Sequence, residues 1–130
     1  MEWLLKSYKK AKNIDLNKSL SENELEIMET LSNRFSRSID IFINKTLRSL
    51  DILELEDISR KLDIVIRAEK RGFVDSYDIL IEMKDLRNEL AHEYIQDNLI
   101  EKFKEVVEKT PILIKIIDKL NQYVNKMRYC

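Results

Sequence analysis

The chain has 130 residues, of which 44% are hydrophobic and 36% are charged. This length fits a single domain over residues 1–130, and the hydrophobic fraction is that of a globular chain, which excludes a disordered one. The formal net charge of −1 excludes a broadly basic nucleic-acid-binding protein, so any contact with nucleic acid must depend on a local patch of cations.

Apolar residues recur at helical spacing along most of the chain. A short first stripe consists of Leu4, Tyr8 and Ala11. Residues 21–24, Ser-Glu-Asn-Glu, form a capping box, in which the serine caps a helix and the second glutamate bonds back to the serine backbone. The stripe after this box predicts one long helix, on the order of 40 Å, that runs to residue 50. Its members are Leu25, Met28, Leu31, Phe35, Ile39, Phe42, Thr46 and Leu50.

The middle of the chain predicts a connector over Asp51–Glu56 and then two further helices. The third helix should end at Gly72, because glycine can take the left-handed conformation of a helix cap. We expect it to bury Ile58, Leu62, Val65 and Ala68. The fourth helix should begin near Asp75 or Ser76. The residues expected to face inward on it are Tyr77, Leu80, Met83 and either Leu86 or Leu90.

The last part of the chain, residues 98–126, predicts either one kinked helix or two stacked helices. Asn98 and Glu101 can cap its start. Pro111 either interrupts a continuous helix or begins a new one after Thr110, since proline is tolerated at the first helical position. A scarcity of turn residues, with one glycine and one proline, argues against an all-β fold. The predicted fold is therefore an all-α bundle of five or six antiparallel helices.

Cellular location is addressed by three features of the sequence. No stretch reaches the roughly 18 apolar residues of a membrane span. The apolar run at the start of the chain is too short for a signal peptide. Cys130 is the only cysteine and cannot form an intrachain disulfide, which agrees with a reducing compartment. We therefore expect a cytoplasmic protein that has no membrane partner.

The residues with the greatest potential for chemistry lie at 87–94, Arg-Asn-Glu-Leu-Ala-His-Glu-Tyr, which we call the octet. His92 is the only histidine, and imidazole titrates near neutrality, so it can act as an acid or a base. Arg87 stays charged and matches phosphate oxygens with a planar fork. In a continuous helix these two residues are about 140° apart, so they converge only if the helix ends or distorts near His92, or if a second chain completes the site.

The octet, with the form Arg-Asn-x-x-x-His-x-Tyr, resembles the motif of HEPN domains. Its tyrosine, Tyr94, resembles that of the HepT branch, the toxins paired with small nucleotidyltransferase antitoxins. The resemblance covers roughly residues 20–125 and implies a HEPN-like homodimer in which two octets face one cleft. It also implies a metal-independent ribonuclease that an adjacent nucleotidyltransferase neutralises by transferring AMP to Tyr94.

The residue types suit this chemistry. Metal-independent RNA cleavage by the 2′-OH needs a base, an acid and a cation that stabilises the developing charge. Two chains would supply two copies each of His92 and Arg87, so the chemistry favours a homodimer. Asn88 can orient the phosphate or the arginine, and Tyr94 can donate a hydrogen bond to a phosphate oxygen. We expect no cofactor and no metal, because the chain has no second histidine and no His-Glu-x-x-His spacing.

Each of these residues also has a purely structural interpretation. His92 can cap helix carbonyls, and Arg87 can pair with Asp85, Glu89 or a neighbouring helix. Tyr94 can be a core aromatic whose hydroxyl reaches water, and Asn88 an ordinary helix residue.

The sequence leaves three functions open. The first is an RNase toxin with Arg87 and His92 as catalytic residues. The second is a non-catalytic, substrate-binding or regulatory subunit of a nucleotidyltransferase, which the near-neutral net charge favours, because proteins that contact many phosphates are usually basic. The third is a helical dimerisation module without a site. We prefer the first function, and the second is the alternative.

Overall fold

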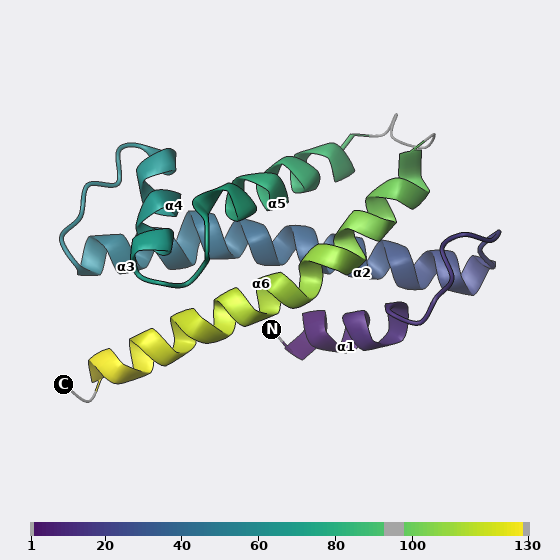
Figure 1. Cartoon of the computed structure of the whole chain (residues 1–130), viewed down its shortest axis with the longest axis horizontal. Helices are drawn as coiled ribbons and strands as arrows, with labels where there is room; N and C mark the ends of the chain where they lie inside the picture. The colour runs from purple at the N-terminus through teal and green to yellow at the C-terminus, as the bar shows by residue number, and fades with distance from the viewer. Residues whose placement is uncertain (1, 93–97, 129–130) are drawn as a thin grey trace.

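The structure is a computed structural model that describes residues 2–92 and 98–128. Within these ranges the regular structure is entirely helical and forms an all-α bundle, as predicted (Figure 1). The elements are α1 (Glu2–Ala11), α2 (Glu22–Ile41), the π-helix η1 (Phe42–Leu47), α3 (Arg48–Leu53), α4 (Lys61–Lys70), α5 (Tyr77–Leu90) and α6 (Leu99–Arg128). Figure 1 shows α1 and α5 antiparallel to α2 on opposite sides of it, α6 crossing α2, and the short α4 lying across the others.

The elements α2, η1 and α3 follow one another without a break, so the predicted long helix is confirmed. It begins at the predicted capping box: the Glu24 N–H donates to Ser21 Oγ at 3.1 Å, and the Ser21 N–H donates to the Glu24 carboxylate at 3.0 Å. The backbone hydrogen bond from Ser21 is the largest cause that lowers the pKa of Glu24. The long helix is the element against which α1, α4, α5 and α6 all pack.

The predicted connector at Asp51–Glu56 begins too early, because the helix continues to Leu53. Asp51 is completely buried and accepts hydrogen bonds from Arg71 at 2.5 Å and Arg67 at 3.1 Å, both from the end of α4. A buried carboxylate needs such partners, because desolvating an unpaired charge is expensive. Burial alone would lower the pKa of Arg71, but the hydrogen bond and charge of Asp51 raise it. Asp51 therefore docks α4 on the long helix.

Both α3 and α4 end in a Schellman motif, in which a residue in the left-handed conformation turns the chain. After α4 this residue is Gly72, with φ of +84°, as predicted. The Phe73 N–H donates to the Ala68 carbonyl, and Phe73 becomes fully buried. After α3 the residue is Leu55, with φ of +62°, which costs about 1–2 kcal/mol more for an L side chain than for glycine.

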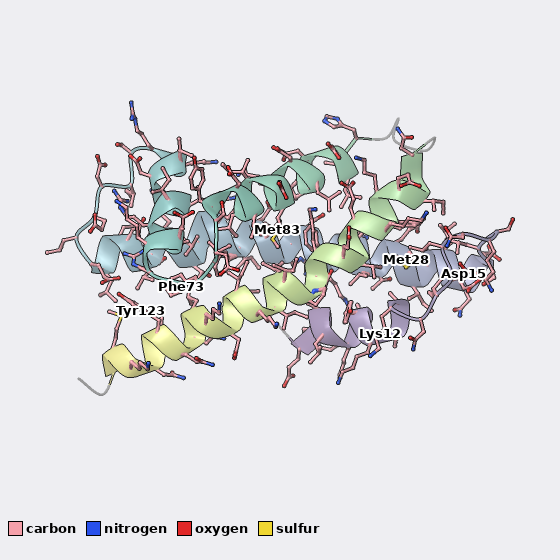
Figure 2. The ribbon with its side chains drawn as sticks, viewed as in Figure 1. Lys12, Asp15, Met28, Phe73, Met83 and Tyr123 are labelled. Carbon is pink, nitrogen blue, oxygen red and sulfur yellow. The ribbon has the colours of Figure 1, made fainter. Side chains whose placement is uncertain are left out.

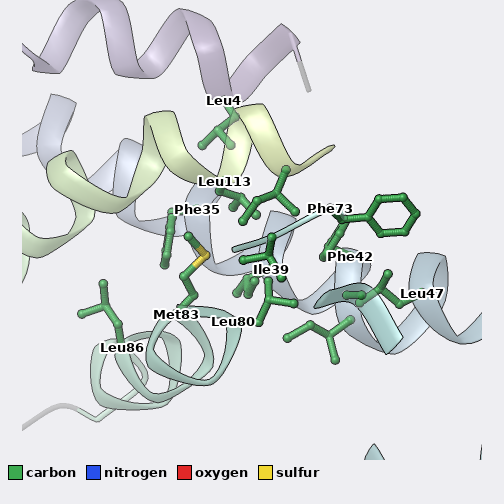
Figure 3. Close-up of a cluster of buried hydrophobic side chains, with 14 of the residues drawn as sticks. Leu4, Phe35, Ile39, Phe42, Leu47, Phe73, Leu80, Met83, Leu86 and Leu113 are labelled. Atoms are coloured by element: carbon green, nitrogen blue, oxygen red, sulfur yellow. The ribbon is translucent and has the colours of Figure 1, made fainter. Parts of the chain in front are cut away.

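The core consists mainly of the residues that the helical stripes predict (Figure 3). From the long helix it includes Phe35, Ile39, Phe42 and Leu47, and from α5 it includes Leu80, Met83 and Leu86. The prediction for the third helix is partly wrong: Leu62 is 51% exposed, and Ile64 is buried in its place.

The alternative left open for residues 98–126 is decided in favour of one helix, since α6 contains Pro111 in its interior. Proline lacks the N–H that would bond four residues back and bends a helix at that point. The buried Thr110 hydroxyl donates to the Val106 carbonyl at 2.6 Å, a contact that also favours bending. Figure 1 shows α6 changing direction near its middle. None of the helices within the described ranges is long and apolar enough to cross a membrane.

The two ends of the described chain are fixed by aromatic side chains. Trp3 on α1 is 65% exposed, with Lys6 and Arg34 lying 5.3 and 5.4 Å from its ring centroid. Arg34, from α2, also donates to the Ser7 hydroxyl at 2.6 Å. At the other end, Tyr123 of α6 meets Phe73 edge to face, with the ring centroids 5.2 Å apart. Figure 2 labels both residues.

We predict that Asp51→Asn lowers the free energy of unfolding by about 3 kcal/mol, because it leaves two arginines beside an uncharged partner. Urea denaturation followed by circular dichroism measures this change. The matched control is Glu56→Gln, which removes an exposed carboxylate from the same Arg67 and should change stability by less than about 1 kcal/mol. Equal effects of the two variants would contradict a special role for the buried carboxylate.

Candidate active site

The octet straddles the C-terminal end of α5. Arg87 lies in the last turn, the helix ends at Leu90, and Ala91 occupies the cap position. The N–H groups of Ala91 and His92 donate to carbonyls three residues back, at 3.2 Å each, so the helix tightens as it ends. The helix thus ends before His92, which is one of the conditions under which an imidazole and Arg87 could converge.

Arg87 is held by a residue of the long helix. Its Nε–H donates to both carboxylate oxygens of Asp40, at 2.8 and 2.9 Å. The two side chains are about one third exposed, at 32% and 34%. Within residues 2–92 and 98–128 the terminal NH2 groups of Arg87 make no hydrogen bond. Asp40 therefore fixes the inner edge of the guanidinium and leaves its outer edge for an anion.

A cavity of about 430 Å³ adjoins Arg87. It lies among three helices and has a mixed lining: α2 contributes polar side chains, α5 contributes Arg87 and an apolar side chain, and α6 contributes apolar side chains. The lining residues are Glu29, Ser32, Asn33, Ser36, Arg87, Leu90, Ala91, Leu99 and Phe103. Its size is in the range of small-molecule sites.

Ser32 gives this cavity an unusual polar atom. Its Oγ is buried and has no hydrogen-bond partner among the described residues. Most buried polar side-chain atoms are hydrogen-bonded, because leaving one unpaired costs about 1–3 kcal/mol. Ser32 is thus a group that a ligand or water in the cavity could satisfy.

The structure brings together only part of the predicted site. Arg87 lines the cavity, whereas Asn88 and His92 are exposed and do not line it. Tyr94, the predicted phosphate ligand and modification site, lies outside the described residues. Of the structural alternatives for Arg87, pairing with a neighbouring helix is observed, and the partner is Asp40 rather than Asp85 or Glu89.

Glu89, also in the octet, connects α5 to the start of α6. Its carboxylate accepts a hydrogen bond from Lys102, which also contacts Glu105 at 3.3 Å. The hydrogen bond to Glu89 is the largest cause that raises the pKa of Lys102. This contact ties together the two helices that flank the cavity.

The described residues contain no group of three or more His, Cys, Asp or Glu side chains that could hold a metal ion. The polar groups at the cavity are hydroxyls, an amide, one guanidinium and the Glu29 carboxylate. Such groups can bind and orient an anion or a polar heterocycle, and Arg87 can stabilise negative charge.

Asp40 and the polar residues of α2 are the site residues that the sequence did not reveal. A polar stripe at Asn33, Ser36, Asp40 and Asn44 runs at helical spacing along a helix whose other face is apolar. This stripe is the feature of the sequence from which the polar wall of the site could have been predicted, because exposed helix faces are usually charged rather than rich in serine and asparagine. The partner of Arg87 could not be chosen from it, since several acidic residues lie on exposed faces.

We predict that Arg87→Ala and Asp40→Asn each change the free energy of unfolding by less than about 1 kcal/mol, because a partly exposed ion pair contributes little. Urea denaturation measures the change. The control is Leu86→Ala on the same helix, which removes a side chain that is only 2% exposed and should cost about 2–5 kcal/mol. A loss of that size in Arg87→Ala would make Arg87 a structural residue.

Comparisons with known proteins identify no family for this chain. A scan against protein-family models, a search of curated proteins and a search of solved structures each found no match. Membership of the HEPN family therefore depends on the octet and stays a prediction.

Proposed function

We propose that this chain is a metal-independent endoribonuclease of the HEPN type, the toxin of a two-component module that a partner nucleotidyltransferase neutralises. The observation that carries the proposal is the position of Arg87, whose Nε side is fixed by Asp40 while it lines a cavity of about 430 Å³. A guanidinium held in this way can present its two NH2 groups to a phosphodiester with little loss of side-chain freedom.

The reaction would use the ribose 2′-OH as nucleophile. The 2′ oxygen attacks the neighbouring phosphorus, the bond from phosphorus to the 5′ oxygen breaks, and the products are a 2′,3′-cyclic phosphate and a free 5′-OH. One group must take the 2′ proton and another must protonate the leaving oxygen. His92 is the side chain assigned to proton transfer, and Arg87 is assigned to the negative charge that develops on the phosphate.

A homodimer would complete this site. His92 does not line the cavity that contains Arg87, and one imidazole cannot serve as base and acid at the same moment. A second chain with its octet facing the first would bring another His92 to the same phosphate. A composite site of this kind agrees with the exposed position of His92 just beyond the end of α5.

The partner nucleotidyltransferase would act on Tyr94, the AMP acceptor that the octet implies. An AMP group there would add a bulky anion two residues from His92 and would compete with RNA for Arg87. Mass spectrometry of the chain co-expressed with such an enzyme would show the added AMP. An unmodified tyrosine in a neutralised complex would remove this part of the proposal.

We predict that the purified protein cuts RNA in the presence of EDTA and leaves 2′,3′-cyclic phosphate ends. His92→Ala should abolish cutting, and Arg87→Ala should lower the rate by about 10²–10³-fold, the usual effect of removing a group that stabilises transition-state charge. Gel assays with end-labelled RNA measure both effects.

The control for this experiment is Lys119→Ala, which removes an exposed cation from α6 and should cut at the wild-type rate. Circular dichroism should show the same helicity in all three variants. Undiminished cleavage by His92→Ala would exclude imidazole from the mechanism, and an absence of any cleavage by wild-type protein would favour the alternative below.

We also predict that wild-type and His92→Ala chains mixed in equal amounts give about a quarter of the activity of the same total amount of wild-type protein. If two imidazoles act on one phosphate, only the dimers of two wild-type chains, one quarter of a random mixture, contain both. Equal amounts are unfolded together, refolded and assayed. Half of the wild-type activity, although native mass spectrometry shows mixed dimers, would mean that one imidazole is enough for each site.

The alternative is a non-catalytic subunit that binds a nucleotide or acceptor for a nucleotidyltransferase. The cavity favours it, because its volume suits a small ligand and Ser32 Oγ has no hydrogen-bond partner within residues 2–92 and 98–128. Isothermal titration with nucleotides tests this function. Nucleotide binding without RNA cleavage would support it, and RNA cleavage without nucleotide binding would dismiss it.

A further inference from the structure

A second hollow, of about 400 Å³, lies on the other side of Arg87. It shares Asn33, Ser36 and Arg87 with the cavity described above, so the two join into one groove. We call this the α2–α5 groove. Its floor follows the long helix from Glu29 to Lys45, a distance of roughly 24 Å at 1.5 Å per residue.

The second half of the groove is rich in cations. Arg37, Lys45 and Arg87 line it together with a single carboxylate, Asp40, which Arg87 already engages. Arg37 and Lys45 are exposed, and neither forms an ion pair with any residue in the described ranges. The groove therefore carries a local positive charge on a chain whose net charge is −1.

Two further cations border this half. Lys84 precedes Arg87 by three positions and so lies on the same face of α5. Burial lowers the pKa of Lys84 most, and the charge of Lys61 on α4 is the next largest cause that lowers it. The charge of Arg87 also lowers this pKa, whereas the charge of Asp40 raises it. Cations that repel one another in this way attract an anion, which would relieve the repulsion.

The groove also contains neutral hydrogen-bonding groups. Asn33, Ser36 and Asn44 line it together with the charged residues. Asn44 and Lys45 belong to η1. A π-turn contains one more residue than an α-turn and so changes the direction of the side chains that follow it, and such turns often occur at functional sites.

We propose that the α2–α5 groove binds the sugar–phosphate backbone of single-stranded RNA, with Arg37 and Lys45 contacting phosphates that follow the one held by Arg87. The inference rests on the proposed ribonuclease function. Arg37 and Lys45 lie roughly 12 Å apart along the helix, and together with Arg87 they match the repeated charges of a phosphodiester chain. The amides and hydroxyl beside them match its oxygens. The opposite half of the groove, with Glu29, Leu90 and Phe103, lacks this charge and leaves room for a base.

The experiment measures the binding of a fluorescent, unstructured RNA whose riboses are 2′-O-methylated, so that it cannot be cut. Fluorescence anisotropy is recorded at several salt concentrations for the full chain and for the double variant Arg37→Gln/Lys45→Gln. Because each lost contact with a single-strand phosphate lowers the salt slope by about 0.7, the variant should bind about tenfold more weakly with a slope smaller by about 1.4.

The matched control is Lys9→Gln/Lys12→Gln, which removes the same charge from exposed lysines of the α1 region. It should bind RNA as the wild type does. Sedimentation velocity should give the same oligomeric state for all three proteins.

The outcomes separate this inference from the proposed function. Groove variants that bind and cut RNA like the wild type would overturn the inference alone, whereas wild-type protein that neither binds nor cuts RNA would overturn both. A changed oligomeric state of the groove variant would mean that the groove lies at a subunit interface. An affinity of the wild-type protein for poly-aspartate equal to its affinity for RNA would mean that the groove binds an acidic polypeptide. Either result would refute RNA as the occupant.

Discussion

The structure depends on one continuous helix, from the capping box at Ser21 to Leu53, because every other helix packs against it. One face supplies the centre of the core, and its final turn carries the buried Asp51, whose charge requires the arginines of α4. A helix this long can position groups far apart along one axis. Asp51 therefore docks the end of α4, and Asp40, on the same helix, orients Arg87 near the end of α5.

The two arginine–aspartate contacts differ in physical character. Asp51 is completely buried, so its ion pairs are needed to keep a desolvated charge neutralised. Asp40 is partly exposed, so its contact with Arg87 adds little to stability and mainly restricts where the guanidinium points. A partly exposed contact such as that of Asp40 with Arg87 suits a site for an incoming anion, because the cation stays accessible while its position is fixed.

Much of the fold could be predicted from apolar spacing and caps, because these signals are local. The capping box, the left-handed Gly72 and the buried stripe of α5 all depend on residues within a few positions of one another. The end of the long helix and the partner of Arg87 depended on contacts between segments distant in sequence. An aspartate that is buried by two distant arginines looks, in the sequence alone, like the aspartate of a loop.

At the candidate site, too, the sequence could not predict the contacts between segments that are distant in the chain. The sequence left open whether the fourth helix ends before His92, and the structure shows that it ends at Leu90 with Arg87 in its last turn. The polar wall from α2 comes from another segment, so spacing within the octet could not reveal it.

The chain also carries its own spectroscopic reporter: Trp3 is the only tryptophan, and its ring lies close to Lys6 of α1 and Arg34 of α2. Indole fluorescence should therefore follow the detachment of α1 from α2 separately from the loss of helicity in the whole molecule.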